Sequence, residues 1–569
     1  MKKKIIPVLV AIVLICVIAA IAFSSQMLGK YSYSKEYADL NEYYELSGQE
    51  DAAIVLQDEI LPEKAKYIED TYYFDYGTVV SYFTDRFYVN EVENVLQFTN
   101  ATDVLTVYIG DDSNTCYISG NEEALGYKAA IYEGDTLYIA AEYVKKFANF
   151  SYETFDAPNR MQVYTEWNTR DTAVIKKKTA IRYQGGVKSD ILQDLQEGDT
   201  VYVLEKLENW SRIKTKNALI GYVENKYLVK ESMEQPSPVT DAMVVEISSI
   251  QKDYTINLGF HQVFNANGDL SGVGTSSSTL NTIAPTWFRI SDNEGGFESL
   301  ANHEYVNAAH ARNLEVWAVL TDVDSKDLYG LDVDLKAVFS STENRNKMIQ
   351  NLISQAVEYE IDGLNIDLES VSKDAGKHFV QFLRELSIQT RANNIVLSVD
   401  NYVPTEYTAF YNRKEQGLFV DYLVVMGYDE HYAGNGEAGS VASINYVESG
   451  IEKTKESVPA EKIINAIPFY TRVWDNSSGS VYGSTLTMRA QADWVAQSGV
   501  EPTWNEETCQ NYVEYTKDGV TYQCWLEDAE SIGVKLNVME SQGIAGIAEW
   551  KLGIEDPAIW SEIDQYVSQ

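Results

Sequence analysis

Histidine and cysteine are scarce in this chain of 569 residues. Its five histidines and four cysteines are scattered, and they do not show the spacing of a zinc site. The sequence therefore predicts neither a metal site nor a cofactor. Cys509 and Cys524 could form a disulfide in an oxidising compartment, but their spacing alone does not decide whether they do.

Positive charge is also in short supply. Lysine and arginine number 45 against 85 aspartates and glutamates, which gives a formal net charge of −40. A strongly acidic surface repels nucleic acid and anionic membrane surfaces, so both are excluded as partners of the bulk of the chain. The length exceeds what one ordinary core supports, and it predicts a multidomain protein.

The first 30 residues differ from the rest because they carry a long apolar run. Residues 5–23 are uncharged and follow three lysines, Lys2, Lys3 and Lys4. About 20 apolar residues cross a bilayer as a helix, and lysines before such a helix keep the short end in the cytoplasm. We therefore predict one transmembrane helix within residues 1–30, which places the protein in the cell membrane with the bulk of the chain outside. A cleaved secretory signal is the alternative, because residues 19–25 are rich in small side chains.

Residues 31–170 are predicted to form an N-terminal α+β domain. After an acidic stretch with helical spacing, short strand-like runs such as 104–109 and 136–140 recur, with turn signals such as Gly110-Asp111-Asp112 between them. Residues 132–156 resemble the small repeat of copper-amine-oxidase N-terminal-like domains. The region contains no histidine, so the resemblance implies no metal here.

Residues 171–232 show a compact all-β pattern, which predicts a small all-β barrel domain. Its W-S-R-I-K and I-G-Y-V pieces, residues 210–214 and 220–223, resemble a bacterial Src-homology-3-like domain. Such domains often bind the cell wall, so the resemblance implies the cell wall as a partner of residues 171–232. A spacer without a ligand is the alternative. Residues 233–241 contain two prolines among polar neighbours, and they predict a linker.

Residues 242–569 alternate between strand and helix patterns. Eight candidate strands lie at residues 256–263, 282–289, 315–320, 363–369, 395–399, 420–426, 463–468 and 544–550. Helical patterns with one apolar stripe lie between them, for example Ile349, Leu352, Ile353 and Ala356. Eight strands alternating with helices predict a (β/α)8 TIM barrel. A doubly wound sheet is the alternative, but no glycine-rich phosphate loop follows any of the strands.

The octet DGLNIDLE, residues 362–369, is the fourth of these strands and carries an unusual polar set. Asn365, Asp367 and Glu369 stand two apart, so in a strand they share one face. Burying two carboxylates on one face is costly, which indicates that they have a chemical role. Glu369 would lie at the C-terminal end of the strand, where barrels of this kind carry their active sites.

The octet's D-G-x-x-x-D-x-E pattern resembles glycoside hydrolase family 18, which includes chitinases and N-acetylglucosaminidases. Three further matches follow in order: Met426-Gly427-Tyr428-Asp429, then Ile467-Pro468-Phe469-Tyr470 with Arg472, and then Trp550. The N-I-D-L-E wording and the C-W-L-E-D-A piece at residues 524–529 look closer to bacterial spore-germination and envelope members of the family. Those members are thought to act on peptidoglycan.

The resemblance implies an exported cell-envelope glycosidase that cleaves β-1,4 linkages next to N-acetylglucosamine. Peptidoglycan is the favoured polymer, because of the expected anchor and wall-type domain, and chitin is the alternative. The family's retaining chemistry is substrate-assisted: the acetamido oxygen of the sugar attacks the anomeric carbon. Glu369 would be the general acid and then the base, Asp367 would hold the acetamido N–H, and Tyr428 would orient the acetamido carbonyl. The substrate-binding residues implied or proposed are Asn365, Met426, Asp429, Tyr470, Arg472, Trp287 and Trp550.

One position departs from the family pattern. Many chitinases carry aspartate where Asn365 stands; asparagine can hydrogen-bond Asp367, but it cannot take up a proton. We therefore expect a pH profile that differs from theirs. The alternative function is a catalytically inactive chitinase-like protein that binds carbohydrate of the cell wall. The presence of both Asp367 and Glu369 favours the enzyme.

Overall fold

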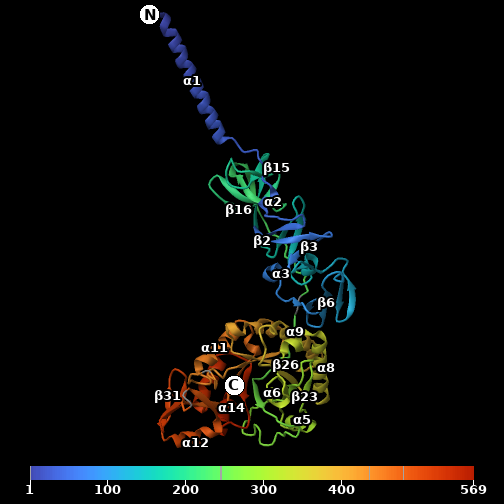
Figure 1. Ribbon diagram of the computed structural model, residues 1–569, viewed down its shortest axis with the longest axis vertical. Coiled ribbons are helices and arrows are strands. Elements are labelled where there is room, and N and C mark those ends of the chain that lie inside the picture. The colour runs from blue at the N-terminus through green and yellow to red at the C-terminus, as the bar shows by residue number, and fades with distance from the viewer. Residues whose placement is uncertain (1, 244–245, 324, 435, 478–479) are drawn as a thin grey trace. The chain divides into compact units, whose positions relative to one another are not determined.

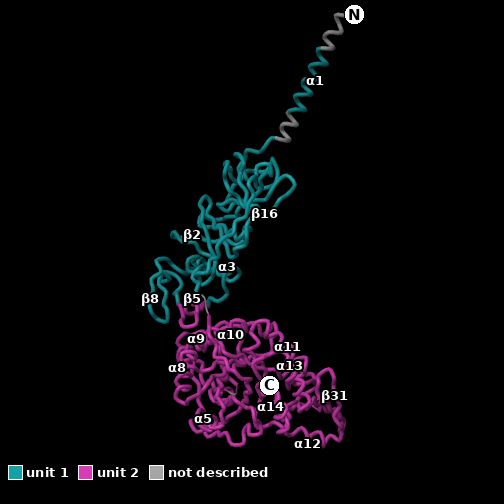
Figure 2. The backbone as a smooth tube through the Cα atoms, turned by 180° about the vertical axis from the view of Figure 1, so that it is seen from behind, with its two compact units in different colours: residues 1–87, 106–244 teal, residues 88–105, 245–569 magenta. Residues whose placement is uncertain are grey.

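The computed structural model describes residues 2–243, 246–323, 325–434, 436–477 and 480–569, without the side chains of residues 2–9 and 25–31. The chain divides into two compact units, which Figure 2 shows in different colours. Unit 1 comprises residues 1–87 and 106–244, and unit 2 comprises residues 88–105 and 245–569. The five predicted domains are a finer division than this one, and they stay predictions.

The prediction of a transmembrane helix is contradicted. Helix α1 runs from Lys2 to Tyr31 (Figure 1). Among the described residues, no helix is both long enough and apolar enough to cross a membrane. The side chains of Lys2–Lys4, on which the predicted orientation depends, lie outside the described residues.

The first sheet of unit 1 has seven strands in the order β11-β12-β1-β2-β3-β10-β9. They are β1 (Asp51–Leu56), β2 (Glu59–Ile68), β3 (Thr71–Asp75), β9 (Ala130–Glu133), β10 (Thr136–Ala140), β11 (Ser151–Phe155) and β12 (Arg160–Tyr164). The helices beside it are short: α2 (Leu40–Tyr43), α3 (Tyr76–Tyr82) and α4 (Ala141–Lys145). The predicted α+β class is therefore wrong, because helices this short bury little surface and the sheet supplies most of the core.

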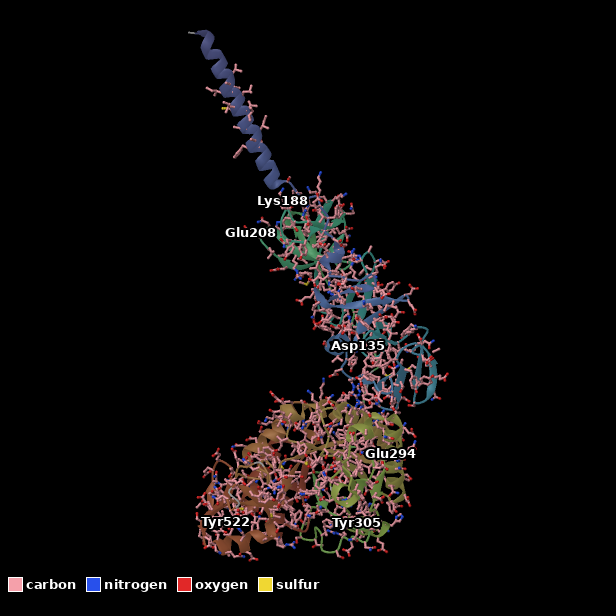
Figure 3. The ribbon with its side chains drawn as sticks, viewed as in Figure 1. Asp135, Lys188, Glu208, Glu294, Tyr305 and Tyr522 are labelled. Atoms are coloured by element: carbon pink, nitrogen blue, oxygen red, sulfur yellow. The ribbon has the colours of Figure 1, made fainter. Side chains whose placement is uncertain are left out.

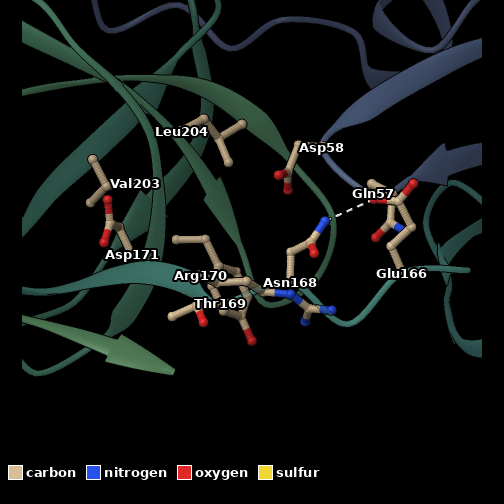
Figure 4. A pocket seen from close by; sticks show the side chains of 10 residues that line it. Gln57, Asp58, Glu166, Asn168, Thr169, Arg170, Asp171, Val203 and Leu204 are labelled. Carbon is tan, nitrogen blue, oxygen red and sulfur yellow. Dashed lines mark hydrogen bonds between the residues drawn. The ribbon is translucent and has the colours of Figure 1, made fainter. Parts of the chain in front are cut away.

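The second sheet of unit 1 has the order β15-β14-β18-β17-β16-β13-β19. Its strands are β13 (Arg170–Ile175), β14 (Thr179–Arg182), β15 (Ile191–Leu195), β16 (Thr200–Lys206), β17 (Trp210–Thr215), β18 (Ile220–Glu224) and β19 (Leu228–Glu234), with the short helix η1 (Asn225–Tyr227) before the last. The all-β prediction for this region is confirmed, while the Src-homology-3-like and amine-oxidase-like resemblances stay predictions. Asp58, in the turn between β1 and β2, and Arg170, on β13, are among the residues that line a cavity of about 250 Å³ (Figure 4).

Unit 2 contains a closed barrel of eight parallel strands. They are β20 (Ile256–His261), β21 (Thr282–Pro285), β24 (Glu315–Thr321), β25 (Gly363–Asp367), β26 (Val396–Tyr402), β27 (Tyr422–Met426), β28 (Ile463–Pro468) and β34 (Gly546–Trp550). The order is β21-β20-β34-β28-β27-β26-β25-β24, and pairing of β21 with β24 closes the ring. All eight predicted strands are present, so the TIM barrel prediction is confirmed. The short hairpin β22 (Phe288–Ile290) and β23 (Phe297–Ser299) extends the second strand.

Helices surround the barrel and follow its strands. The α-helices are α5 (His303–His310), α6 (Ser325–Tyr329), α7 (Leu335–Ser340), α8 (Thr342–Glu358), α9 (Gly376–Ala392), α10 (Arg413–Phe419), α11 (Ile444–Lys455), α13 (Ala529–Gln542) and α14 (Trp560–Val567). Three short turns, η2 (Glu406–Tyr411), η3 (Ala460–Lys462) and η4 (Pro557–Ile559), are 3-10 helices. The predicted stripe of α8 packs against the strands: Ile349, Leu352 and Ala356 are buried.

Alternation along each strand separates two cores. On β25, Leu364 and Ile366 belong to the large cluster between strands and helices. A second cluster fills the inside of the barrel with residues such as Leu258, Trp317 and Val424. Because successive side chains of a strand point to opposite faces, Asn365 and Asp367 face the inside. The predicted shared face of these two residues is therefore the barrel interior.

Residues 88–105 belong to unit 2, although they lie within the region 31–170 in sequence. Strands β4 (Tyr88–Asn90) and β5 (Val95–Thr99) form a hairpin in this segment. The Tyr88 hydroxyl lies 2.6 Å from Nδ1 of His378 on α9, and the amide of Asn90 donates to the Ser340 carbonyl at 2.5 Å. The hairpin thus covers the ends of α7 and α8 and one face of α9. The strands that follow it are β6 (Val104–Tyr108), β7 (Thr115–Ile118) and β8 (Asn121–Ala124).

An antiparallel sheet is inserted between the seventh and eighth barrel strands. It has the order β30-β29-β33-β32-β31. Its elements are β29 (Tyr470–Asp475), β30 (Tyr482–Thr487), α12 (Met488–Ser498), β31 (Thr503–Asn505), β32 (Gln510–Lys517) and β33 (Val520–Trp525). Cys509 and Cys524 both lie in this insertion, and both are free thiols in the structure.

Candidate active site

Two neighbouring strands carry matched rows of polar residues on the inside of the barrel. The parallel register of β25 and β26 sets Asn365 beside Ser398. Because alternate residues share a face, Asp367 follows on one strand and Asp400 on the other. Glu369 lies two residues beyond the end of β25, and Tyr402 ends β26. The predicted three-residue face is therefore one half of a larger polar group.

Hydrogen bonds join the two rows. The side-chain amide of Asn365 donates to Ser398 Oγ at 3.0 Å and to Asp400 Oδ1 at 2.7 Å. The Tyr402 hydroxyl donates to Glu369 Oε2 at 2.8 Å. The Asn365 carbonyl oxygen has no hydrogen-bond partner among the described residues. The expected bond between Asn365 and Asp367 is therefore replaced by bonds to the neighbouring strand.

Asp322, directly after β24, fixes the backbone that presents Glu369. Its carboxylate accepts the backbone N–H of Glu369 at 2.8 Å and that of Ser370 at 2.9 Å. Beyond the end of β25 these two backbone N–H groups have no partner strand, and the Asp322 carboxylate accepts their hydrogen bonds instead. The position of Glu369 at the mouth is thus set by its backbone as well as by Tyr402.

A cavity of about 100 Å³ lies at the C-terminal mouth of the barrel. Its lining residues are Asp367, Glu369, Asp400, Tyr402, Met426, Tyr428, Asp429, Tyr470 and Trp550. Seven of these belong to the site that the sequence predicts, and they come from the ends of three barrel strands, β25, β27 and β34, and from the inserted sheet. Asp400 and Tyr402 were not predicted, although their S-x-D-x-Y spacing repeats the signal of the octet.

The far wall of this cavity is held by one shared acceptor. Asp429 Oδ1 accepts the Tyr470 hydroxyl at 2.7 Å and an Arg472 guanidinium N–H at 2.9 Å. Tyr470 and Arg472 belong to β29 of the inserted sheet, just beyond the seventh barrel strand. Arg472 does not line the cavity itself, and its visible effect is to hold Asp429 and through it Tyr470.

The two tryptophans of the predicted site have different positions. Trp550 ends β34, lines the cavity and packs with its ring centroid 5.6 Å from that of Phe260. Trp287 is fully buried in the core between strands and helices, with its ring centroid 5.0 Å from Tyr305, which Figure 3 labels. The structure therefore brings Trp550 to the cavity and leaves Trp287 and the buried Asn365 outside its lining.

Burial and like charges keep protons in this cavity. Burial raises the pKa of Asp367 well above its usual range, and the neighbouring Asp400, Glu369 and Asp322 carboxylates raise this pKa further. Burial likewise raises the pKa of Asp400 to about 8, although the hydrogen bond from Asn365 acts in the opposite direction. The pKa of Tyr428 is also raised well above its usual value, mainly by burial, so its hydroxyl remains a donor. The site can therefore hold and move protons near neutral pH.

Replacing Tyr402 by phenylalanine should lower kcat about tenfold with a smaller change in KM. The phenol donates to Glu369 and fixes the orientation of its carboxyl, and one such hydrogen bond contributes about 0.5–1.5 kcal/mol, up to roughly a factor of ten in rate. Steady-state kinetics measure this change. Tyr407→Phe is the matched control because Tyr407 is 89% exposed on η2, and it should leave kcat unchanged. An equal loss in both variants would contradict the role of Tyr402.

A closed parallel barrel that gathers carboxyls, phenols and one tryptophan at its C-terminal mouth defines a glycosidase-type TIM barrel. The family model described as Glycosyl hydrolases family 18 matches residues 251–555, more than half of the chain. The chain belongs to this family.

Similar proteins and a solved structure agree with this assignment. The chain is 27% identical over 299 residues to the uncharacterized glycosylase YvbX of Bacillus subtilis, covering 50% of this chain and 84% of that protein. It is 25% identical over 264 residues to the cortical fragment-lytic enzyme of Bacillus anthracis, covering 45% of this chain and 60% of that enzyme. The crystal structure of a chitinase from Chromobacterium violaceum shares the fold, with a TM-score of 0.50 and 22% identity over 55% of this chain and 99% of that one.

Proposed function

We propose that this chain hydrolyses β-1,4 glycosidic bonds next to N-acetylglucosamine, with retention at the anomeric carbon. The observation that carries the proposal is the shared lining of one cavity by Asp367, Glu369, Tyr428 and Trp550. A carboxylic acid, a second carboxyl, a phenol and an aromatic floor are the groups that acetamido-assisted hydrolysis requires.

In this mechanism the substrate supplies its own nucleophile. The acetamido oxygen bonds to the anomeric carbon while Glu369 donates a proton to the leaving oxygen, so the glycosidic bond breaks and a cyclic oxazolinium ion forms. Asp367 accepts the acetamido N–H and stabilises the positive charge, and the Tyr428 hydroxyl donates to the acetamido oxygen. Glu369, now ionised, removes a proton from water as the water opens the ring.

Peptidoglycan is the polymer we favour over chitin. Relatives named cortical fragment-lytic enzymes, from Bacillus anthracis and Bacillus cereus, match this chain at 25% and 26% identity, and a chitinase A1 matches at 22% over a smaller share. The relatives' names support peptidoglycan by analogy.

Product analysis by mass spectrometry on purified sacculi, and in parallel on chitin oligosaccharides, tests the proposal. We expect muropeptide fragments that end in a reducing N-acetylglucosamine from sacculi, and slower release of sugar from chitin oligosaccharides. Faster cleavage of chitin would overturn the choice of polymer. Binding to sacculi without products from either substrate would overturn hydrolysis and would support the sugar-binding alternative.

A further inference from the structure

Two carboxyls, and not one, lie side by side inside the barrel at the base of the cavity. Asp367 and Asp400 are only 7% and 5% exposed, and both line the cavity with Glu369. The register that pairs Asn365 with Ser398 and Ile366 with Val399 brings the next residues together: Asp367, which ends β25, and Asp400, which lies two residues before the end of β26. Asp400 belongs to no motif that led to the family, so its presence needs its own explanation.

The surroundings of the pair disfavour two negative charges. The charged groups that act on Asp367 and Asp400 are acidic: Glu369, beyond β25, raises the pKa of both, and Asp322, after β24, raises that of Asp367. Asp429 is occupied by Arg472, and the phenols of Tyr402, Tyr428 and Tyr470 complete the lining around the pair. Two neighbouring carboxyls without a cation between them retain one proton and titrate as a unit.

We propose that Asp400 is a positioning residue that shares one proton with Asp367 and supplies, from β26, the carboxyl that position 365 lacks. Asn365 donates to Asp400 at 2.7 Å and so lowers the proton affinity of Asp400 relative to that of Asp367, which makes Asp400 the first member of the pair to ionise. When Asp367 accepts the acetamido N–H of a sugar, its proton passes to Asp400 and the total charge of the pair is unchanged. This catalytic part of the proposal rests on the proposed function.

The shared proton can be measured without any substrate. A carboxyl whose pKa is higher in the folded than in the unfolded chain binds a proton on folding. The contribution of Asp400 to stability is therefore complete below its unfolded pKa of about 4, and it is lost as the pH rises through its folded pKa of about 8. The denaturant midpoint of the wild type should therefore fall between about pH 5 and pH 9, and that of Asp400→Asn should fall less. Asp374→Asn, whose side chain is 78% exposed, should keep the wild-type slope. An unchanged slope in Asp400→Asn overturns the proposal.

Exchanging the amide of Asn365 and the carboxyl of Asp400 tests whether the second carboxyl acts from either strand. Asp400→Asn should lower kcat about tenfold at neutral pH, and should move the alkaline limb of kcat/KM down by about one pH unit, because Asp367 loses its like-charged neighbour. The double variant Asn365→Asp with Asp400→Asn restores one carboxyl and one amide across the same hydrogen bond, so it should recover to within about threefold of the wild type. A double variant no more active than Asp400→Asn overturns the proposal.

The shared proton and the hydrolytic activity are tested by separate measurements. If wild type cleaves neither sacculi nor chitin oligosaccharides, the proposed function fails, while the pH slope of stability still decides whether the proton is shared. If Asp400→Asn does not fold, Asp367→Asn replaces it, because removal of either member of the pair should flatten the same slope. A wild-type slope in Asp367→Asn then overturns the shared proton.

Discussion

Glu369→Gln should lower kcat by about 10³-fold while leaving KM within a few-fold of the wild type. Glutamine keeps the shape of the side chain and can still accept the Tyr402 hydroxyl, but it cannot donate a proton to the leaving oxygen or remove one from water. The backbone of residue 369 stays in place because its N–H is held by Asp322 and not by the side chain. The loss should therefore fall on the chemical step rather than on binding.

The measurement is release of reducing sugar from sacculi and from chitin oligosaccharides, with binding to sacculi measured in parallel. Glu406→Gln is the matched control: it makes the same change at the same end of the barrel, on an exposed residue at the start of η2. It should leave kcat unchanged. If Glu369→Gln hydrolyses either substrate at the wild-type rate, Glu369 is not the acid.

The barrel could be predicted from the sequence because its strands are buried on both faces. Each therefore appears as a short apolar run, and the order of runs and helical stripes is enough to identify a closed parallel sheet. The octet was visible for the opposite reason, because polar residues two apart interrupt such a run. Seven residues of the cavity follow from these patterns and the family motif.

Asp400 and Tyr402 were missed because the fifth strand was expected to end at Val399. The strand continues to Tyr402, and this continuation brings Ser398, Asp400 and Tyr402 onto one inward face. The apolar run ends where the strand begins to line the cavity, so the residues that act there look like a loop. Functional strand ends are where a hydrophobic pattern is least informative.

The structure also depends on contacts that no local pattern reveals. The hairpin of residues 88–105 meets helices whose residues lie roughly 250 to 290 positions further along the chain. Likewise, Arg472 contributes to the site only because the inserted sheet folds back over the barrel mouth to reach Asp429. Alternation and spacing indicate the type of an element, but not which distant element it meets.

Breaking the buried ion pair of Arg345 and Glu385 should cost unit 2 about 3–5 kcal/mol of unfolding free energy. The Arg345 guanidinium donates to both carboxylate oxygens of Glu385, at 2.8 and 3.0 Å, and to the Phe339 carbonyl at 2.7 Å. The arginine side chain is fully buried and that of Glu385 is 8% exposed. Gln381 extends the network by donating to Glu385 and to Thr99 of the hairpin.

Glu385→Leu leaves the Arg345 guanidinium buried without its counter-charge, which strongly lowers the free energy of unfolding. Replacing both charged residues by apolar ones does not leave a buried charge and costs little. The double variant Arg345→Met with Glu385→Leu should therefore recover most of the lost stability. Glu91→Leu removes one partner of an exposed pair with Lys377, whose side chains are 61% and 46% exposed, and should cost less than about 1 kcal/mol. Denaturant unfolding followed by tryptophan fluorescence reports on unit 2, because most of the chain's ten tryptophans lie in it. Equal losses in Glu385→Leu and Glu91→Leu would show that the hairpin and α9 are held by apolar packing and not by this pair.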